Sequence, residues 1–174
     1  ATNFFGALAV TRAVLPLMRA QRSGHIFTVS SVGGLVGAEG GSIYSATKFA
    51  LEGWSEGISF ELKQFGIRTT LVEPGFFRTD FLDASSVSYG DIVIADYADY
   101  SAAFKARLDD INHTQAGDPG RLGEAIVALA ASDDPPVRFA AGSDAYGVIT
   151  DRAAKDRAVA DTWRALSIST DIAE

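Results

Sequence analysis

Three side chains that could move a proton stand at short, regular intervals in one stretch of this chain. An apolar run ends in Ser30 and Ser31, Tyr44 follows thirteen residues after Ser31, and Lys48 lies four residues beyond Tyr44. Residues four apart on a helix are neighbours on one face, so a helix over 43–65 would place the phenol beside the ammonium. A nearby cation favours a phenolate over a phenol and brings a tyrosine closer to the range in which general acids and bases work.

The same stretch predicts proton transfer to or from the oxygen of a carbonyl or an alcohol. Tyr44 would give a proton to a ketone or take one from an alcohol, and Ser31 could donate a hydrogen bond to the same oxygen. A tyrosine and a lysine at this spacing also occur on solvated helix faces, so the pair alone is weak evidence. The preceding strand, the paired serines and the glycine-rich segment 32–41 favour catalysis, with Ser30 as a neighbour that bonds the backbone.

Helices and strands must hold these groups in place. Apolar periodicity predicts a helix over 3–22, in which Pro16 should kink or locally adjust the backbone. Ser42 can cap the helix over 43–65, which Gly66 ends. Near-continuous apolar runs are typical of buried parallel strands, and strand–helix–strand forms a right-handed βαβ unit. We also expect strands over 25–31, 67–73 and 138–143, and helices over 97–114, 119–131 and 145–166, with Asp118-Pro119 opening the second of these helices.

Four short motifs occur in one order along the first eighty residues. They are N-F-F-G at Asn3 to Gly6, V-S-S at Val29 to Ser31, Y-S-A-T-K at Tyr44 to Lys48, and P-G-F-F-R-T at Pro74 to Thr79. With these motifs the chain resembles the short-chain dehydrogenase/reductase family, in detail to about residue 80 and more loosely to about residue 147. Four motifs at the family's spacings are far more specific than any one of them.

The resemblance implies a catalytic set and a cofactor. Ser31, Tyr44 and Lys48 would form the catalytic triad, and Asn3 would be a fourth member that holds a water in a proton relay. NAD or NADP would supply the hydride, while Tyr44 and Lys48 also contact the cofactor and Lys48 holds its ribose. Further contacts with the nicotinamide and its phosphates are expected from Pro74, Gly75, Phe77 and Thr79.

The resemblance also implies an assembly and an upstream segment. In the family, the helices corresponding to 3–22 and 43–65 pair across a two-fold axis, so we expect a homodimer or a homotetramer. The family's glycine-rich phosphate loop lies before the first of these helices. Because the chain opens with Ala1 at a helix entrance, we expect it to be the C-terminal part of a longer protein.

The alternation of elements predicts an α/β fold: the C-terminal part of a doubly wound, Rossmann-like parallel sheet flanked by helices. Residues 1–147 would form a partial NAD(P)-binding catalytic domain, and residues 148–174 a C-terminal helix and tail. Within the domain, 80–118 is rich in aromatic and aliphatic residues. It follows the carboxyl end of a strand, where such a segment could act as a substrate lid.

Composition narrows the possible partners. The 174 residues contain no cysteine, which excludes disulfides and thiolate chemistry and is compatible with the expected cytoplasmic location. The formal net charge is −7 and no Lys/Arg cluster is present, so nucleic acid and anionic membranes are poor partners. No apolar run approaches the roughly 18 residues of a membrane span. The expected partner is a small-molecule carbonyl or alcohol substrate.

Several features have a plainer interpretation. The glycines of 33–41 lack the G-x-G-x-x-G pattern, so we expect a flexible loop beside the active site rather than a phosphate loop. Asn3 could simply cap a helix, and Thr79 could cap the next turn. His25 and His113 lie far apart and lack paired carboxylates nearby in the sequence, so no metal site is expected.

Two rival functions stay open. The chain could be a non-catalytic fragment, or a partner-binding remnant, of such an enzyme, in which case NADH and NADPH would not stabilise it. It could also be a sugar-nucleotide epimerase or dehydratase, because those enzymes use a Y-x-x-x-K pair as well. The short length after Lys48 leaves little room for a sugar-nucleotide domain.

Overall fold

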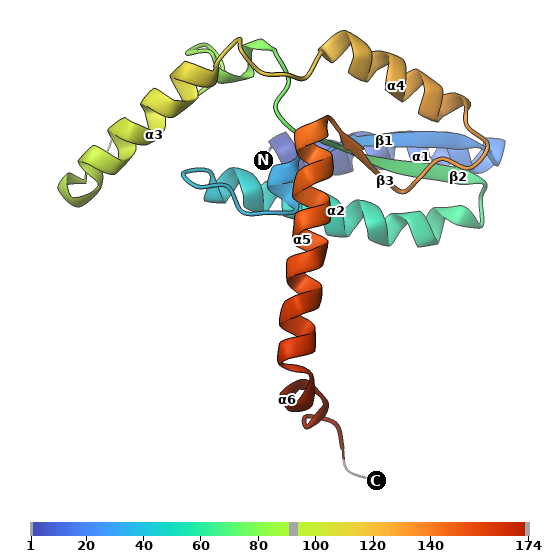
Figure 1. The fold of residues 1–174 in the computed structure, drawn as a ribbon. Helices are drawn as coiled ribbons and strands as arrows, with labels where there is room; N and C mark the ends of the chain where they lie inside the picture. The colour runs from blue at the N-terminus through green and yellow to red at the C-terminus, as the bar shows by residue number, and fades with distance from the viewer. Residues whose placement is uncertain (1, 91–93, 173–174) are drawn as a thin grey trace.

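Three parallel strands form the centre of the computed structural model, which describes residues 2–90 and 94–172 (Figure 1). β1 (Gly24–Val29) pairs with β2 (Ile67–Pro74), and β2 pairs with β3 (Arg138–Ala141), giving the order β1-β2-β3. Leu71 and Val72 in β2 are fully buried, because the central strand is covered on both faces. The predicted α/β class with a parallel sheet flanked by helices is therefore confirmed.

The first helical segment differs from the single helix predicted over 3–22. A π-helical turn (η1, Thr2–Gly6) leads directly into α1 (Ala7–Gln21), which runs through Pro16 as one element. The plainer role considered for Asn3, capping the start of this helix, is wrong for α1. Its N-cap position is Gly6, which is already helical with φ −62° and ψ −47° and makes no side-chain cap bond. The preceding turn therefore continues into the helix without a free cap position.

β1 ends two residues earlier than predicted. Val29 is its last residue, although the Ser30 amide still donates to the Val72 carbonyl at 2.8 Å. Ser31 then caps a short 3₁₀ turn, η2 (Val32–Gly34), because its Oγ accepts the Gly33 amide proton. The strand stops where this local hydrogen bond replaces the sheet ladder.

α2 (Ser42–Lys63) confirms the long predicted helix but not its predicted cap. Gly41 occupies the N-cap position without a side-chain bond, and Ser42 is already the first helical residue. The Gly41 carbonyl accepts the Ser45 amide proton at 2.8 Å, so the first helical bond begins one residue before the predicted cap, Ser42. At the other end Gly66 has φ 68°, and a Cβ there would lie 2.5 Å from the Arg22 carbonyl oxygen.

The remaining elements follow the predicted order with shifted ends. Asp118 caps α4 (Pro119–Ala131) by accepting the Gly120 and Arg121 amide protons, as predicted. The last strand stops at Ala141 because Gly142 takes φ 101°, and the last long helix is interrupted at Trp163. The other elements are η3 (Asp80–Leu82), η4 (Ala95–Tyr97), α3 (Ala98–Ile111), α5 (Ser143–Thr162) and α6 (Arg164–Ile168).

The outer elements reach away from the sheet. α5 leaves the carboxyl end of β3 and projects from the body, with α6 at its far end (Figure 1). α3 extends outward at the upper left of Figure 1, within the predicted lid over 80–118, of which residues 91–93 lie outside the described residues. The predicted boundary at 147/148 falls inside α5. Among the described helices, none is long and apolar enough to cross a membrane.

Candidate active site

The hydroxyl of Ser31 and the ring of Tyr44 meet at one glycine. A Cβ built on Gly33 would lie 3.2 Å from Tyr44 Cε1 and 3.5 Å from Ser31 Oγ. η2 supplies the serine from the carboxyl end of β1, and the first turn of α2 supplies the tyrosine. The Ser31 oxygen accepts the Gly33 amide proton at 3.1 Å, which leaves the hydroxyl proton free to be donated. The structure thus brings two of the predicted catalytic residues together.

Lys48 lies one turn further along α2, on the same face as Tyr44. Its Nζ donates to the Val29 carbonyl oxygen at 3.0 Å and stands 5.6 Å from the centroid of the Tyr44 ring. Burial lowers the pKa of Lys48 from its ordinary value, and the negative charge of Glu52 acts in the opposite direction. An ammonium has three donors, so two remain for other partners.

Asn3 reaches the same helix through one intermediate residue. Its Nδ2 donates to Thr47 Oγ1 at 3.3 Å, and the Thr47 hydroxyl donates to the Tyr44 carbonyl at 2.7 Å. η1 therefore holds Asn3 against the turn of α2 that lies between Tyr44 and Lys48. The side chain of Asn3 therefore bonds Thr47 on α2 and does not cap its own helix.

The turn after β2 is tied to two other elements. The Gly75 amide donates to the Ala141 carbonyl at 3.0 Å, and the Phe76 amide donates to Asp144 Oδ2 at 2.7 Å. A Cβ on Gly75 would collide with the Asp144 carboxylate, so only glycine fits here without displacement. Sequence reasoning missed Asp144, whose one visible sign was an acidic residue in the first turn of a helix.

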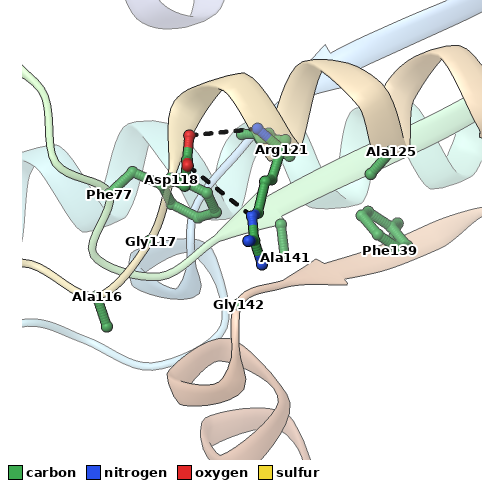
Figure 2. A pocket seen from close by; sticks show the side chains of 10 residues that line it. Phe77, Ala116, Gly117, Asp118, Arg121, Ala125, Phe139, Ala141 and Gly142 are labelled. Atoms are coloured by element: carbon green, nitrogen blue, oxygen red, sulfur yellow. Dashed lines mark hydrogen bonds and ion pairs between the residues drawn. The ribbon is translucent and has the colours of Figure 1, made fainter.

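Phe77 is the predicted cofactor residue that lines a cavity. The cavity has a volume of about 400 Å³ and lies between the start of α4 and the end of β3, with Arg121 and Phe139 also on its wall (Figure 2). Phe77 is joined to Gly117 by an isolated parallel bridge. The predicted catalytic residues Ser31, Tyr44 and Lys48 are not among the ten residues that line it.

Thr79 makes the capping contact that was considered as its plainer role. Its Oγ1 accepts the Phe81 amide proton at 3.3 Å at the start of η3. This cap fixes Phe81, whose ring centroid lies 6.0 Å from that of Tyr44. Thr79 is therefore linked through Phe81 to Tyr44, one of the predicted catalytic residues.

The predicted lid contacts the loop that precedes Tyr44. Arg107 on α3 donates to Glu39 at 3.0 Å, and a Cβ on Gly40 would lie 2.6 Å from the Phe104 ring. Gly40 has φ 67°, a backbone conformation that favours glycine. On the opposite side Arg152 of α5 donates to the Leu35 carbonyl at 2.6 Å. Two helices that are remote in sequence therefore hold this loop.

The two histidines occupy different surroundings. His25 bonds Thr70 Oγ1 at 2.9 Å, and burial, assisted by the charge of Arg68, lowers its pKa. His113 Nε2 lies 2.9 Å from Asp83 Oδ1, and ligand atoms of Asp80, Asp83 and His113 lie within 4.8 Å of one another. The sequence did not indicate this cluster, because η3 and the end of α3 meet only in the fold.

Comparison with known proteins finds one matching family model and similar oxidoreductases. A family model described as short chain dehydrogenase matches residues 1–89. An oxidoreductase of Botryotinia fuckeliana is 35% identical over 97% of this chain and 61% of its own length. A 3-ketodihydrosphingosine reductase of Bacteroides thetaiotaomicron is 40% identical over 81% of the chain and 52% of its own length. The chain thus spans about half to three fifths of these two relatives.

Solved structures of short-chain dehydrogenases have the same fold as this chain. A short-chain dehydrogenase from Streptomyces avermitilis superposes with a TM-score of 0.82 and 37% identity, covering 97% of this chain and 60% of that one. Two more distant structures share the fold alone. They are a Burkholderia phymatum protein in complex with NAD (21% identity, TM-score 0.65, 78% and 50% of the two chains) and a Burkholderia cenocepacia protein in complex with NADP (22%, 0.60, 92% and 55%).

Proposed function

Because the chain belongs to the short chain dehydrogenase family, we propose that the intact protein interconverts a carbonyl and a secondary alcohol, with NAD or NADP as its cofactor. The observation that carries the proposal is the meeting of the Ser31 hydroxyl and the Tyr44 ring at Gly33. One helical turn away, the Lys48 ammonium stands 5.6 Å from that ring. This set of groups supports acid–base chemistry at one substrate oxygen.

The proton-handling steps follow from the donors that these residues have. In the direction of reduction Tyr44 gives its phenolic proton to the carbonyl oxygen, while the Ser31 hydroxyl donates a hydrogen bond that orients the same oxygen. The Lys48 ammonium then stabilises the phenolate left on Tyr44. Asn3, which lies against the intervening turn through Thr47, would hold a water that returns a proton to this site. In the direction of oxidation the same residues act in reverse.

The residues present fit the nicotinamide end of the cofactor. When bound, the cofactor supplies or accepts the hydride at the carbonyl carbon. The Pro74–Gly75 turn lies at the carboxyl end of a parallel strand, where open α/β sheets bind ligands. Lys48 donates one observed hydrogen bond to the Val29 carbonyl, so its other two N–H donors can bind ribose hydroxyls. Phe77, Thr79 and the phenol of Tyr44 are the further contacts proposed.

An apolar part of the substrate is supported by the surface around the site. Phe81 is 59% exposed although its ring lies 6.0 Å from that of Tyr44, and Phe76 is 51% exposed. Exposed aromatic side chains beside a reactive group favour an apolar ligand surface. A relative that reduces 3-ketodihydrosphingosine, as its name states, is consistent with a keto substrate that carries an apolar chain.

Replacement of Tyr44 by phenylalanine tests the proposal. The variant lacks only the phenolic oxygen, so turnover of ketones with NADH or NADPH should fall by about 10²-fold or more, because general acid catalysis typically contributes that much. The matched control is Tyr146→Phe, which removes the same oxygen from an exposed residue of α5 and should leave turnover unchanged. Near-native turnover of Tyr44→Phe would contradict the assignment.

Cofactor binding is tested without a substrate. If the intact protein binds NADH or NADPH, the cofactor should raise its melting temperature in a concentration-dependent manner, because a ligand that binds only the folded state stabilises it. The absence of any shift with either dinucleotide would favour a non-catalytic, partner-binding role instead.

Self-association is proposed from the outer surfaces of α1 and α2. Large apolar side chains are exposed on both helices: Val10, Leu17, Ile43 and Phe60 are 67%, 62%, 80% and 75% exposed. Exposed apolar residues gathered on neighbouring elements are typical of protein contact surfaces. We propose a homodimer or homotetramer that buries them.

A further inference from the structure

Two carboxyl groups are buried against each other beneath the candidate active site. Glu52 on α2 is 4% exposed, and Glu73 near the end of β2 is 1% exposed. One arginine holds both, because Arg138 Nη1 donates to Glu52 Oε2 and, at 3.0 Å, to Glu73 Oε1. The other terminal nitrogen of Arg138 donates to Glu56 at 2.7 Å. None of these four residues has a part in the proton transfer proposed above.

The charges of this cluster do not balance when every carboxyl is ionised. Glu52, Glu56 and Glu73 carry three negative charges against two positive charges, those of Arg138 and of the neighbouring Lys48. In addition, Glu52 Oε1 is buried and receives no hydrogen bond. A buried acceptor without a donor costs about 1–3 kcal/mol. One proton shared by the two buried carboxyls would neutralise the excess negative charge. The same proton would donate a hydrogen bond to the unbonded carboxylate oxygen.

The ionisation behaviour of Glu73 agrees with this. Burial, reinforced by the charge of Glu52, raises the pKa of Glu73 to about 7, while Arg138 acts in the opposite direction. A proton is therefore held on the pair under conditions in which ordinary glutamates are ionised.

One member of the pair, Glu52, lies next to the proposed catalytic residue Lys48. Tyr44, Lys48, Glu52 and Glu56 follow one another at intervals of four residues, so they lie on successive turns of one face of α2. A Cβ built on Gly34 would lie 3.0 Å from Glu52 Cγ and 3.1 Å from the Lys48 carbonyl carbon. The ionised carboxylate of Glu52 also favours the charged form of Lys48.

We propose that Glu52 and Glu73 share one buried proton and act as a positioning pair for Lys48, setting how firmly its ammonium keeps its own proton. The significance for catalysis rests on the proposed function, but the pair itself does not. The charged and polar groups that face it are Lys48 and Glu56 from α2, Arg138 from β3 and the Ser30 hydroxyl after β1. Loss of the shared proton would place a second negative charge beneath Lys48 and strengthen its hold on the ammonium proton.

The first test follows Lys48 directly. In the intact protein labelled with ¹³C at lysine Cε, the resonance that disappears in Lys48→Met reports the titration of this ammonium. Glu52→Gln keeps the shape of the side chain but removes its charge, so it should lower the Lys48 midpoint by about one pH unit. The matched control is Glu56→Gln, which also loses a carboxylate bound to Arg138 but is exposed, and it should move the midpoint by less than about 0.3 pH unit.

The second test detects the shared proton. With ¹³C-carboxyl glutamate, the wild-type protein should show one carboxyl that stays protonated at pH 6, and Glu73→Gln should lack it. If Glu52→Gln does not fold, Glu73→Gln serves for both measurements, because it removes the second charge and should also lower the Lys48 midpoint. The proposal would be overturned if every carboxyl were ionised at pH 6. It would also be overturned if the Lys48 titration midpoint were the same in the wild type, in the Glu56→Gln control and in whichever of Glu52→Gln and Glu73→Gln folds. Neither measurement uses turnover, so a failed Tyr44→Phe test leaves both results interpretable.

Discussion

The buried pair makes a specific prediction about stability and pH. The folded-state pKa of Glu73 is raised from 4.5 to about 7, so the folded protein binds a proton that the unfolded chain releases more readily. A raised pKa contributes stability that is fully present below the unfolded value and is lost as pH rises through the folded value. Stability from this group should therefore fall between about pH 4.5 and pH 7.

The magnitude follows from the size of that rise. At about 1.4 kcal/mol for each pH unit, a rise from 4.5 to about 7 corresponds to about 3 kcal/mol of lost stability by pH 8. This figure already includes the opposing effect of Arg138, which favours the ionised form of Glu73. Glu73→Gln cannot ionise and should lose this dependence while keeping a neutral donor near Glu52.

Urea unfolding of both proteins between pH 5 and pH 8 measures the effect. The free energy of unfolding of Glu73→Gln, relative to the wild type, should increase with pH by about 1–3 kcal/mol across this range. The difference between the two proteins removes the contributions of titrating groups that do not interact with Glu73. A difference that stays constant with pH, with both proteins folded, would refute the reasoning about the shared proton.

Two further predictions concern the turn after β2 and the outer helix surfaces. Gly75→Ala should lower the free energy of unfolding by about 1.5–3 kcal/mol, because the new Cβ displaces the Asp144 carboxylate from the Phe76 amide. The same substitution in an Asp144→Ala background should cost clearly less in urea unfolding, and an equal cost would contradict the contact. By light scattering at micromolar concentration the wild type should be a dimer or tetramer, and Phe60→Glu should weaken this assembly. The control Val159→Glu changes a similarly exposed apolar residue on α5 and should not, and a monomeric wild type would rule out self-association.

Much of the site could be predicted because it depends on spacing within one βαβ unit. The interval from Tyr44 to Lys48 decides which face of α2 they share, whatever the rest of the chain does. Apolar runs predicted both central strands, and the Asp118-Pro119 pair marked the start of α4. These features depend on contacts between residues that are close in sequence, so local chemistry was sufficient.

Local chemistry failed at the ends of several elements and at Asn3. Ser42 has a side chain suited to a helix cap, yet α2 starts one residue earlier than that role requires. Asn3 could cap its own helix, but its amide bonds Thr47, forty-four residues away. The ends of β1 and β3 were placed too late, because a 3₁₀ turn and the left-handed Gly142 stop the strands first.

The sequence by itself determined which side chains are available for proton transfer, their order, and the parallel α/β class. Only the tertiary structure decided which of them meet, since Ser31 and Tyr44 approach each other at a glycine between two elements. It alone placed Asp144 against Gly75, and Arg138 between Glu52 and Glu73. The physical reason is that burial and charge balance depend on segments 65 to 86 residues apart, which no local pattern records.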